Sequence, residues 1–364
     1  MRLVRNFQAE APLVPARVPL GSSKATLRRP GRRSRALPAA IAAFSVAALA
    51  AGCQTSGAGS GAAGSGSSVI TVAAIRGVDD APLYLAAAPN GTFAKAGLNV
   101  RIRSYPSVGQ ELKALQDGTV DVAAGDYADF LYAQSVSRHP DLRIVADGYH
   151  AAPGVMEVLA SPGSGINSPQ GLVGKKVGTP EPQGIPIQSG KPYSLETLAT
   201  QSVLTNDNVD PKQVTWDPMP AGDLINALAD HKVDAVLLQE PYIYQAETRL
   251  GAVEVLDSCS GPTANLPLSG YFAVNSFATA TAHAQALVEF RSALQQAQAN
   301  AALPGPVRTV LASGPGMTPQ SASLVTIGAY PTTLDTASPE RVESLMFNFE
   351  MLSTALNVQR MILR

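Results

Sequence analysis

The sequence is poor in the side chains that build metal sites and covalent cross-links. Its 364 residues include two cysteines, four histidines and one tryptophan. Cys53 and Cys259 cannot form a disulfide framework, and the histidines show neither an HExxH spacing nor a cluster with cysteine. We therefore expect no metal ion and no cofactor.

The apolar run at residues 36–51 is too short to cross a membrane as a helix, which takes about 18–20 residues. It follows a basic segment, residues 1–35, and ends in small residues at Ala51 and Gly52. A basic stretch, a short apolar stretch and small residues are typical of a secretory signal peptide. We predict that residues 1–52 are such a signal; the paired arginines before the apolar run are also compatible with a twin-arginine export signal.

Removing this signal changes the charge of the protein. The chain has 27 Lys and Arg and 28 Asp and Glu; nine and one of these lie in residues 1–52, which leaves 18 and 27 and a net charge of −9. An acidic protein is repelled by phosphate backbones, so we expect no nucleic-acid partner.

A lone cysteine, Cys53, stands directly after the apolar run. This arrangement resembles the bacterial lipobox, which implies lipidation of Cys53, although Leu49 lies one place further from the cysteine than the usual leucine. The alternative is ordinary secretion with an incidental cysteine. Residues 54–68 are rich in Gly, Ala and Ser, so we expect residues 53–68 to be a lipidated cysteine and a flexible linker.

Short β-rich segments alternate with helical patterns from residue 69 onward, which indicates a parallel α/β architecture. The expected strands are 69–75, 98–105, 119–126, 141–149, 154–161, 174–180, 213–219, 233–239 and 270–276; the expected helices are 81–97, 108–118, 194–207 and 221–231, and the C-terminal third is mostly helical.

An internal match indicates two lobes. The segment ALQDGTVDVAAGD, from Ala114, aligns with ALADHKVDAVLLQ, from Ala227, and both read as a helix end, a tight turn and a buried strand. We interpret Asp121 and Asp234 as turn formers. The equivalent strand ends, at residues 125–127 and 240–242, are then expected to face each other across a cleft, because ligands of open α/β sheets bind at the carboxyl ends of strands.

Several motifs then occur in a fixed order. PLYLAAAPNGTFAKAGLNV, LQDGTVDVAAGD, SPQGLVGKKVG, VDAVLLQEP and YFAVNS resemble the type II periplasmic binding protein fold, and more narrowly the aliphatic sulfonate, nitrate, taurine and thiamine-pyrimidine-precursor binding proteins of ABC importers. The resemblance implies a two-lobed α/β fold with a central ligand cleft. Lobe 1 would comprise residues 69–153 and 270–364, and lobe 2 residues 154–269, with crossovers near 148–155 and 267–272.

The same resemblance implies a function and a location. It implies an extracytoplasmic lipoprotein, held on the outer face of a bacterial membrane, that captures a small solute and delivers it to an ABC permease and ATPase. We expect a monomer and no enzymatic activity. The alternatives are a cofactor-independent enzyme and a surface or sensor protein on the same fold, but the sequence has no GxSxG motif, no P-loop and no GxGxxG motif that follows a strand.

Ten residues near the expected strand ends are candidate ligand contacts: Arg76, Asp79, Tyr84, Tyr105, Ser107, Asp126, Tyr127, Thr179, Glu240 and Tyr242. The alternative to ligand contact, for each of them, is a role as a helix cap, in a surface turn or in the core. Nitrate and sulfonate need donors, whereas carboxylates with aromatic rings suit a flat donor-bearing heterocycle or an amine. We therefore favour a heteroaromatic compound or an amine over sulfonate or nitrate as the solute.

Overall fold

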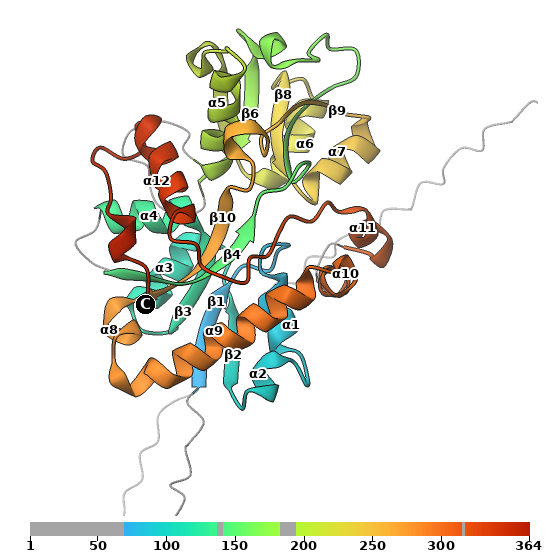
Figure 1. The fold of residues 1–364 in the computed structure, drawn as a ribbon. Helices are drawn as coiled ribbons and strands as arrows, with labels where there is room; N and C mark the ends of the chain where they lie inside the picture. Colours follow the sequence, from blue (N-terminus) through green and yellow to red (C-terminus); the bar gives the residue numbers. More distant parts are fainter. Residues whose placement is uncertain (1–68, 137–140, 183–193, 315–316) are drawn as a thin grey trace, which may run out of the picture. The chain divides into compact units, whose positions relative to one another are not determined.

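A computed structural model describes residues 69–136, 141–182, 194–314 and 317–364. The predicted signal peptide, Cys53 and the linker that follows it lie outside these ranges. Of the described helices, none has the length and apolar character needed to span a membrane. The described part of the chain is built around two β-sheets, and each of them carries helices on both faces (Figure 1).

The first sheet has five strands in the order β2-β1-β3-β10-β4. Their bounds are β1 Val69–Ala74, β2 Asn99–Ser104, β3 Val122–Asp126, β4 Leu142–His150 and β10 Pro267–Val274. The strands β1, β2 and β3 are parallel, and β10 is antiparallel to both β3 and β4.

The second sheet repeats this arrangement in the order β7-β6-β8-β5-β9. Its strands are β5 Met156–Ala160, β6 Lys176–Pro180, β7 Thr215–Met219, β8 Ala235–Gln239 and β9 Val253–Asp257. The strand β5 is antiparallel to β8 and β9, in the place that β10 takes in the first sheet. The equivalence of β3 and β8 agrees with the internal sequence match.

The expectation of parallel sheets was therefore wrong for one strand in each sheet. The strands β10 and β5 follow the two connections between the sheets, so each enters its sheet from the end at which the parallel strands finish. It consequently runs in the opposite direction. The strand β9 also escaped the sequence pattern, because two of its five residues are exposed and its apolar run is short.

Helices α1 (Ala81–Ala87), α2 (Thr92–Lys95) and α9 (Thr281–Ala301) cover one face of the first sheet. Phe93 of α2 stacks on Phe290 of α9 with 5.2 Å between ring centroids. The single helix expected over 81–97 is interrupted, because Asn90 takes a left-handed conformation (φ 62°) in the turn before α2. The other face carries α3 (Val108–Gln116) and α4 (Tyr127–Val136).

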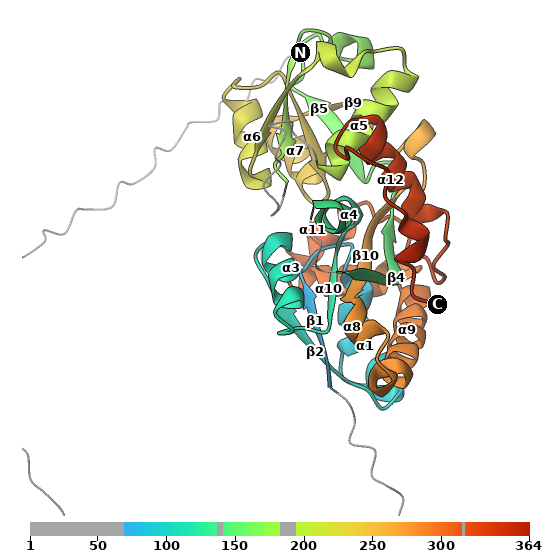
Figure 2. The same ribbon diagram turned by 90° about the vertical axis from the view of Figure 1, so that its left-hand side faces the viewer.

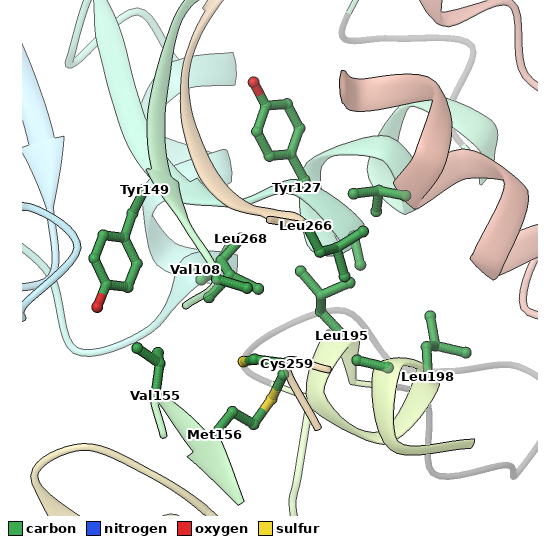
Figure 3. Close-up of a cluster of buried hydrophobic side chains, with 14 of the residues drawn as sticks. Val108, Tyr127, Tyr149, Val155, Met156, Leu195, Leu198, Cys259, Leu266 and Leu268 are labelled. Atoms are coloured by element: carbon green, nitrogen blue, oxygen red, sulfur yellow. The ribbon is translucent and has the colours of Figure 1, made fainter. Parts of the chain in front are cut away.

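The second sheet packs against α6 (Ala221–Ala229) and α7 (Tyr242–Leu250) on one face and against α5 (Leu195–Asn206) on the other. Figure 3 shows Leu195 and Leu198 of α5 in a buried cluster with Met156 and Cys259. The Cys259 side chain is only 1% exposed, and burial raises the pKa of its thiol to about 12. It therefore acts as a small apolar core residue.

The C-terminal segment contains α10 (Pro304–Ala312), α11 (Pro319–Leu324) and α12 (Ser338–Asn348), after the short α8 (Asn275–Ala278). Helix α12 contacts both α4 and α5, and so touches helices of both sheets (Figure 2). The Arg341 guanidinium on α12 donates hydrogen bonds to the backbone carbonyls of Pro262, Ala264 and Asn265 at 2.8–3.1 Å. Four short 3₁₀ helices, Pro169–Leu172, Pro211–Gln213, Gly261–Thr263 and Val358–Arg360, complete the described elements.

The chain passes between the sheets twice. It leaves β4 at His150 and enters β5 at Met156, and it leaves β9 at Asp257 and returns to the first sheet in β10 at Pro267. These connections lie close to the two expected crossovers. The boundary drawn after residue 269 falls inside β10, and the division into lobes at that point stays a prediction.

Candidate ligand-binding site

The carboxyl ends of the parallel strands of both sheets open onto two adjoining cavities. Their volumes are about 470 and 430 Å³, and both are lined by Ile75, Val108, Asp126, Glu196, Gln239, Glu240 and Tyr242. We call the two cavities together the cleft. Its position matches the rule that α/β sheets bind ligands beyond the carboxyl ends of their strands.

The first sheet contributes the loop after β1 and the end of β3. Arg76, Asp79 and Asp80 line the cleft from this loop, and Asp126 lines it from the last position of β3. Asp126 Oδ1 accepts hydrogen bonds from the backbone N–H groups of Ala128 (2.6 Å) and Asp129 (3.2 Å) at the start of α4. These bonds fix the carboxylate at the strand end, and Asp129 lines the cleft from the next turn.

The second sheet contributes α5 and the loop after β8. Ser194 caps α5 by accepting a hydrogen bond from the Thr197 N–H (3.2 Å), and Glu196 stands in the first turn. Glu240 and Tyr242 follow β8 directly. Glu240 Oε1 accepts from the Thr326 N–H (3.1 Å) and Oε2 from the Tyr244 N–H (3.3 Å), so this carboxylate joins the second sheet to the C-terminal segment.

Arg76 is the one lysine or arginine that lines the described cleft, and its charge is held at the rim. Its guanidinium donates to Ser313 Oγ (2.6 Å) and to the Val310 carbonyl (3.2 Å) at the end of α10. It also lies over the Tyr84 ring, 4.6 Å from the centroid. The arginine thus binds α10 to the loop after β1.

The carboxyl groups of the cleft have raised pKa values, so they keep their protons to a higher pH than exposed carboxyl groups do. Burial raises the pKa of Asp79 to about 6 and that of Asp129 to about 7, and the negative charge of Glu196 adds to both increases. Burial, followed by the charges of Asp129 and Glu196, raises the pKa of Asp126 well above its ordinary value. Burial also raises the pKa of Glu196 and Glu240.

The structure brings together half of the residues predicted for the site. Arg76, Asp79, Asp126, Glu240 and Tyr242 line the cleft. The other five lie outside its lining: Tyr84 lies beneath Arg76, Tyr105 packs against the core, Ser107 precedes α3, and Tyr127 and Thr179 are wholly buried.

Tyr127 needs a correction, because its side chain belongs to the core. Its hydroxyl donates to Asp147 Oδ1 (3.1 Å), and its ring meets Phe272 edge-on with centroids 5.4 Å apart. In Figure 3 the ring points away from Val108, which lines the cleft. The residue begins α4, and its side chain packs against Phe272 of β10 and reaches Asp147 of β4.

Thr179 also needs a correction. It lies inside β6 with no exposed surface, one residue before Pro180, which does line the cleft. Because successive side chains of a strand point to opposite faces, the strand end reaches the cleft through its last residue rather than through Thr179.

Glu196 and Glu111 are among the carboxyl groups at the cleft that the sequence analysis did not select. Glu196 lines both cavities, but an acidic residue two places after a capping serine is ordinary helix chemistry and gave no functional signal. Glu111 of α3 is wholly buried. In the sequence it is one of several polar residues of an amphipathic helix, so nothing indicated that it lies on the buried face. Its carboxylate borders the cleft at Gly125.

A larger cavity, of about 760 Å³, lies between α5 and the residues that follow α12. Trp216 and Phe349 line it, and the Trp216 indole N–H donates to the Pro211 carbonyl (3.2 Å). It is away from the carboxyl ends of β1, β3, β6 and β8, so the cleft remains the candidate site. Within the described ranges, no three His, Cys, Asp or Glu side chains converge as metal ligands would.

Solved structures with a similar fold include ligand-binding proteins of the periplasm and of ABC-type import systems. The periplasmic aliphatic sulphonate binding protein of Escherichia coli matches with a TM-score of 0.66 and 16% identity, over 81% of this chain and 97% of its own. The alkanesulfonate-binding protein of Xanthomonas axonopodis pv. citri, bound to MOPS, matches with a TM-score of 0.62 and 16% identity over the same shares. The ligand-binding component of an ABC-type import system from Staphylococcus aureus, with zinc bound, matches with a TM-score of 0.60 and 13% identity over 81% and 96%.

These matches define the class: the chain has the α/β fold of periplasmic binding proteins. A search of curated protein sequences finds no match. Residues 78–304, more than half of the sequence, match the NMT1/THI5-like family, and the chain belongs to that family. The matched range includes every strand of the two sheets except β1, and every carboxyl group named in the cleft.

Proposed function

We propose that the protein is the extracytoplasmic solute-binding component of an ABC importer. It captures a small organic solute in the cleft, between the strand ends of the two sheets, and presents it to a membrane permease that an ATPase drives. The protein itself catalyses no reaction. The observation that carries this proposal is the cleft, whose lining comes from equivalent strand ends in both sheets.

The two sides of the cleft belong to parts of the chain that are joined by two connections. Such parts close on a ligand by hinge motion about the connecting segments. Glu240, Tyr242 and Glu196 on one side, and Asp79 and Asp126 on the other, then contact the solute together. The acidic lining supports a solute that donates hydrogen bonds, a heteroaromatic compound or an amine, over sulfonate or nitrate.

The location follows from the N-terminal segment. A signal peptide exports the chain, lipidation of Cys53 anchors it to the outer face of the cell membrane, and residues 54–68 act as the tether. A tethered binding protein stays close to its permease, which raises the effective concentration of loaded protein at the transporter.

A ligand panel tests the proposal. Thermal unfolding of the purified protein is followed with taurine, an alkanesulfonate and nitrate in one set, and with pyrimidines, flavins and amines in the other. A solute at 100 times its Kd stabilises the folded protein by about 2.7 kcal/mol, which is a shift of about 4 °C at this size. Stabilisation by members of one set supports the proposal. No stabilisation by any member, together with no co-purified solute in native mass spectrometry, contradicts it.

A further inference from the structure

Carboxylates face each other across the cleft. Glu196, on the α5 side, lines one cavity with Asp126 and Asp129 and the other with Asp79 and Asp126, all from the first-sheet side. Its negative charge adds to the raised pKa values of these three aspartates. Like charges held together in a partly dry space repel one another, and this repulsion opposes closing of the cleft. A group with the opposite charge between them would turn the repulsion into attraction.

The cleft has few positive charges to balance this lining. Besides these four carboxylates, Asp80, Glu181 and Glu240 line it, whereas Arg76 is the one basic side chain in the lining. Arg76 is bound to Ser313 and Val310 and stacked on Tyr84, at the rim. An anion in the described cleft would therefore meet seven carboxyl groups and one guanidinium, which is already bound to other groups of the protein.

Glu111 adds an observation that is independent of the exposed lining. Its side chain is wholly buried, and neither carboxylate oxygen has a hydrogen-bond partner in the described structure. It lies behind Gly125 in the cleft wall, where a Cβ on Gly125 would stand 3.5 Å from Glu111 Oε2. Unsatisfied buried polar oxygens are costly, and they indicate that a donor is missing from this part of the wall.

A metal ion does not suit this arrangement. The carboxyl groups are spread around two cavities of about 470 and 430 Å³, and no three of them in the described ranges converge on one point. Such a lining fits an extended organic molecule whose charge is spread over several N–H donors.

We propose that the solute is an organic cation, an ammonium or amidinium compound, whose charged group lies between Asp126 and Asp129 on one side and Glu196 on the other. This inference rests on the proposed function of the cleft. The cation links the two sides, so binding and closing are coupled. The ligand-free cleft resists closing because the carboxylates then face one another alone.

Binding of the cation is linked to pH. Burial raises the pKa of Asp79 to about 6 and that of Asp129 to about 7, with Glu196 contributing to both, so these groups hold protons near neutral pH. Asp80, Asp126 and Glu111 also have raised pKa values, and Arg76 is the basic group on this side. A cation favours the ionised carboxylates and displaces their protons, so affinity rises from pH 5.5 to pH 8.

Matched probes test the charge requirement on the purified protein. Benzamidine, benzamide and benzenesulfonate share a ring and differ in charge, and putrescine with 1,4-butanediol form a second, non-aromatic pair. We expect thermal stabilisation by benzamidine or putrescine at pH 8, weaker stabilisation at pH 5.5, and none by the neutral or anionic partners. Stabilisation by benzenesulfonate or a neutral probe, without the cations, overturns this inference and leaves the proposed function standing. No stabilisation by either cation also overturns it.

Two variants locate the charged contact. Glu196→Gln and Asp129→Asn change one side of the cleft each, and we expect each to weaken binding of the responding cation about ten-fold or more. Glu254→Gln is the matched control, because Glu254 is exposed on β9 and outside the cleft. Without ligand, Glu196→Gln and Asp129→Asn should raise the melting temperature at pH 8 by removing repulsion. Unchanged cation affinity in both variants contradicts the assignment.

Discussion

The Asp234 side chain accepts a hydrogen bond from the backbone N–H of Lys176, with 2.8 Å between Oδ2 and the nitrogen. Asp121 makes the same bond to the Thr71 N–H, at 2.7 Å. In each case the aspartate precedes the central strand, β8 or β3, and its partner lies in the neighbouring strand, β6 or β1. These two matched positions of the internal repeat, which we interpreted as turn formers, therefore share one structural role: each side chain bonds the backbone of the neighbouring parallel strand and so fixes the register of the pair.

Removing these side chains should weaken the two sheets. We expect Asp121→Ala and Asp234→Ala each to lower the free energy of unfolding by about 1 kcal/mol, measured by urea denaturation. The matched controls are Asp121→Asn and Asp234→Asn, which keep an acceptor oxygen and should lose less. Equal losses in the alanine and asparagine variants would show that the charge, and not the acceptor, is what matters.

The ligand-free protein should become less stable as the pH rises from 5 to 9. Burial raises the pKa of Glu111 to about 9, that of Asp79 to about 6 and that of Asp129 to about 7. In the unfolded chain these groups release their protons near pH 4. Between these limits the folded state holds more protons, so the stability that they provide is lost as the pH rises through the folded pKa values.

Glu111→Gln isolates the largest of these contributions. The amide does not titrate, so we expect its stability to fall less steeply between pH 5 and 9 than that of the wild type. Urea denaturation at pH 5, 7 and 9 measures the slopes, and Glu254→Gln serves as the exposed control. A wild-type stability that rises over this range would contradict the assigned protonation of the cleft.

Tyr127→Phe separates a core role from a ligand role. The variant loses the buried hydrogen bond to Asp147 Oδ1, so we expect the free energy of unfolding to fall by about 1 kcal/mol. Because the ring lies outside the cleft, affinity for any solute found in the panel should stay the same. Isothermal titration calorimetry of this variant beside Tyr242→Phe makes the comparison, and a loss of affinity in Tyr127→Phe alone would reverse our placement.

Arg76 and Ser313 should be energetically coupled. Arg76→Ala removes the bond to Ser313 Oγ, the bond to the Val310 carbonyl and the stacking on Tyr84, whereas Ser313→Ala removes the first alone. A double-mutant cycle should give a coupling of about 0.5–1 kcal/mol, since the pair is exposed. Hydrogen exchange should become faster in α10 when Arg76 is replaced. Full additivity of the two changes would mean that the contact contributes nothing.

Cys53→Ser tests the anchor. The full chain, expressed in a bacterial host, should partition with the membrane fraction, and the variant should not be lipidated at this position. Mass spectrometry of the mature N-terminal peptide reports a diacylglycerol-modified Cys53 directly. An unmodified cysteine in the exported wild-type protein would favour ordinary secretion. Cys259→Ser is the control, because that thiol is buried in the core.

Much of the fold could be predicted, because most strands and helices carry a strong local pattern. Alternation predicted nine of the described strands within a few residues, and the Ala114 and Ala227 segments revealed the repeated unit. The direction of β10 and β5 could not be predicted from the sequence, because it depends on the chain entering each of these strands from the other sheet. Helix α4 was hidden because Tyr127 and its neighbours looked like a loop at a strand end.

The lining of the candidate cleft was predicted only in part, for a similar reason. Position after a strand identified Arg76, Asp79, Asp126, Glu240 and Tyr242, because strand ends of one sheet meet at one edge. Glu196 reaches the cleft from a helix on the facing side, and only the tertiary arrangement places it near Asp129. The direction of the Tyr127 ring likewise depends on the turn into α4, which the sequence pattern does not specify.

Native mass spectrometry of the freshly purified protein tests the central claim most directly. We predict a population that carries one small bound molecule, lost on mild collisional activation, and an Asp126→Lys/Glu196→Lys variant without it, because the two lysines place cations in the cleft. Far-ultraviolet circular dichroism confirms that this variant is folded. The cleft is not a solute-binding site if the wild type carries no solute and the ligand panel shows no stabilisation. The same conclusion follows if the double-lysine variant binds the solute as the wild type does.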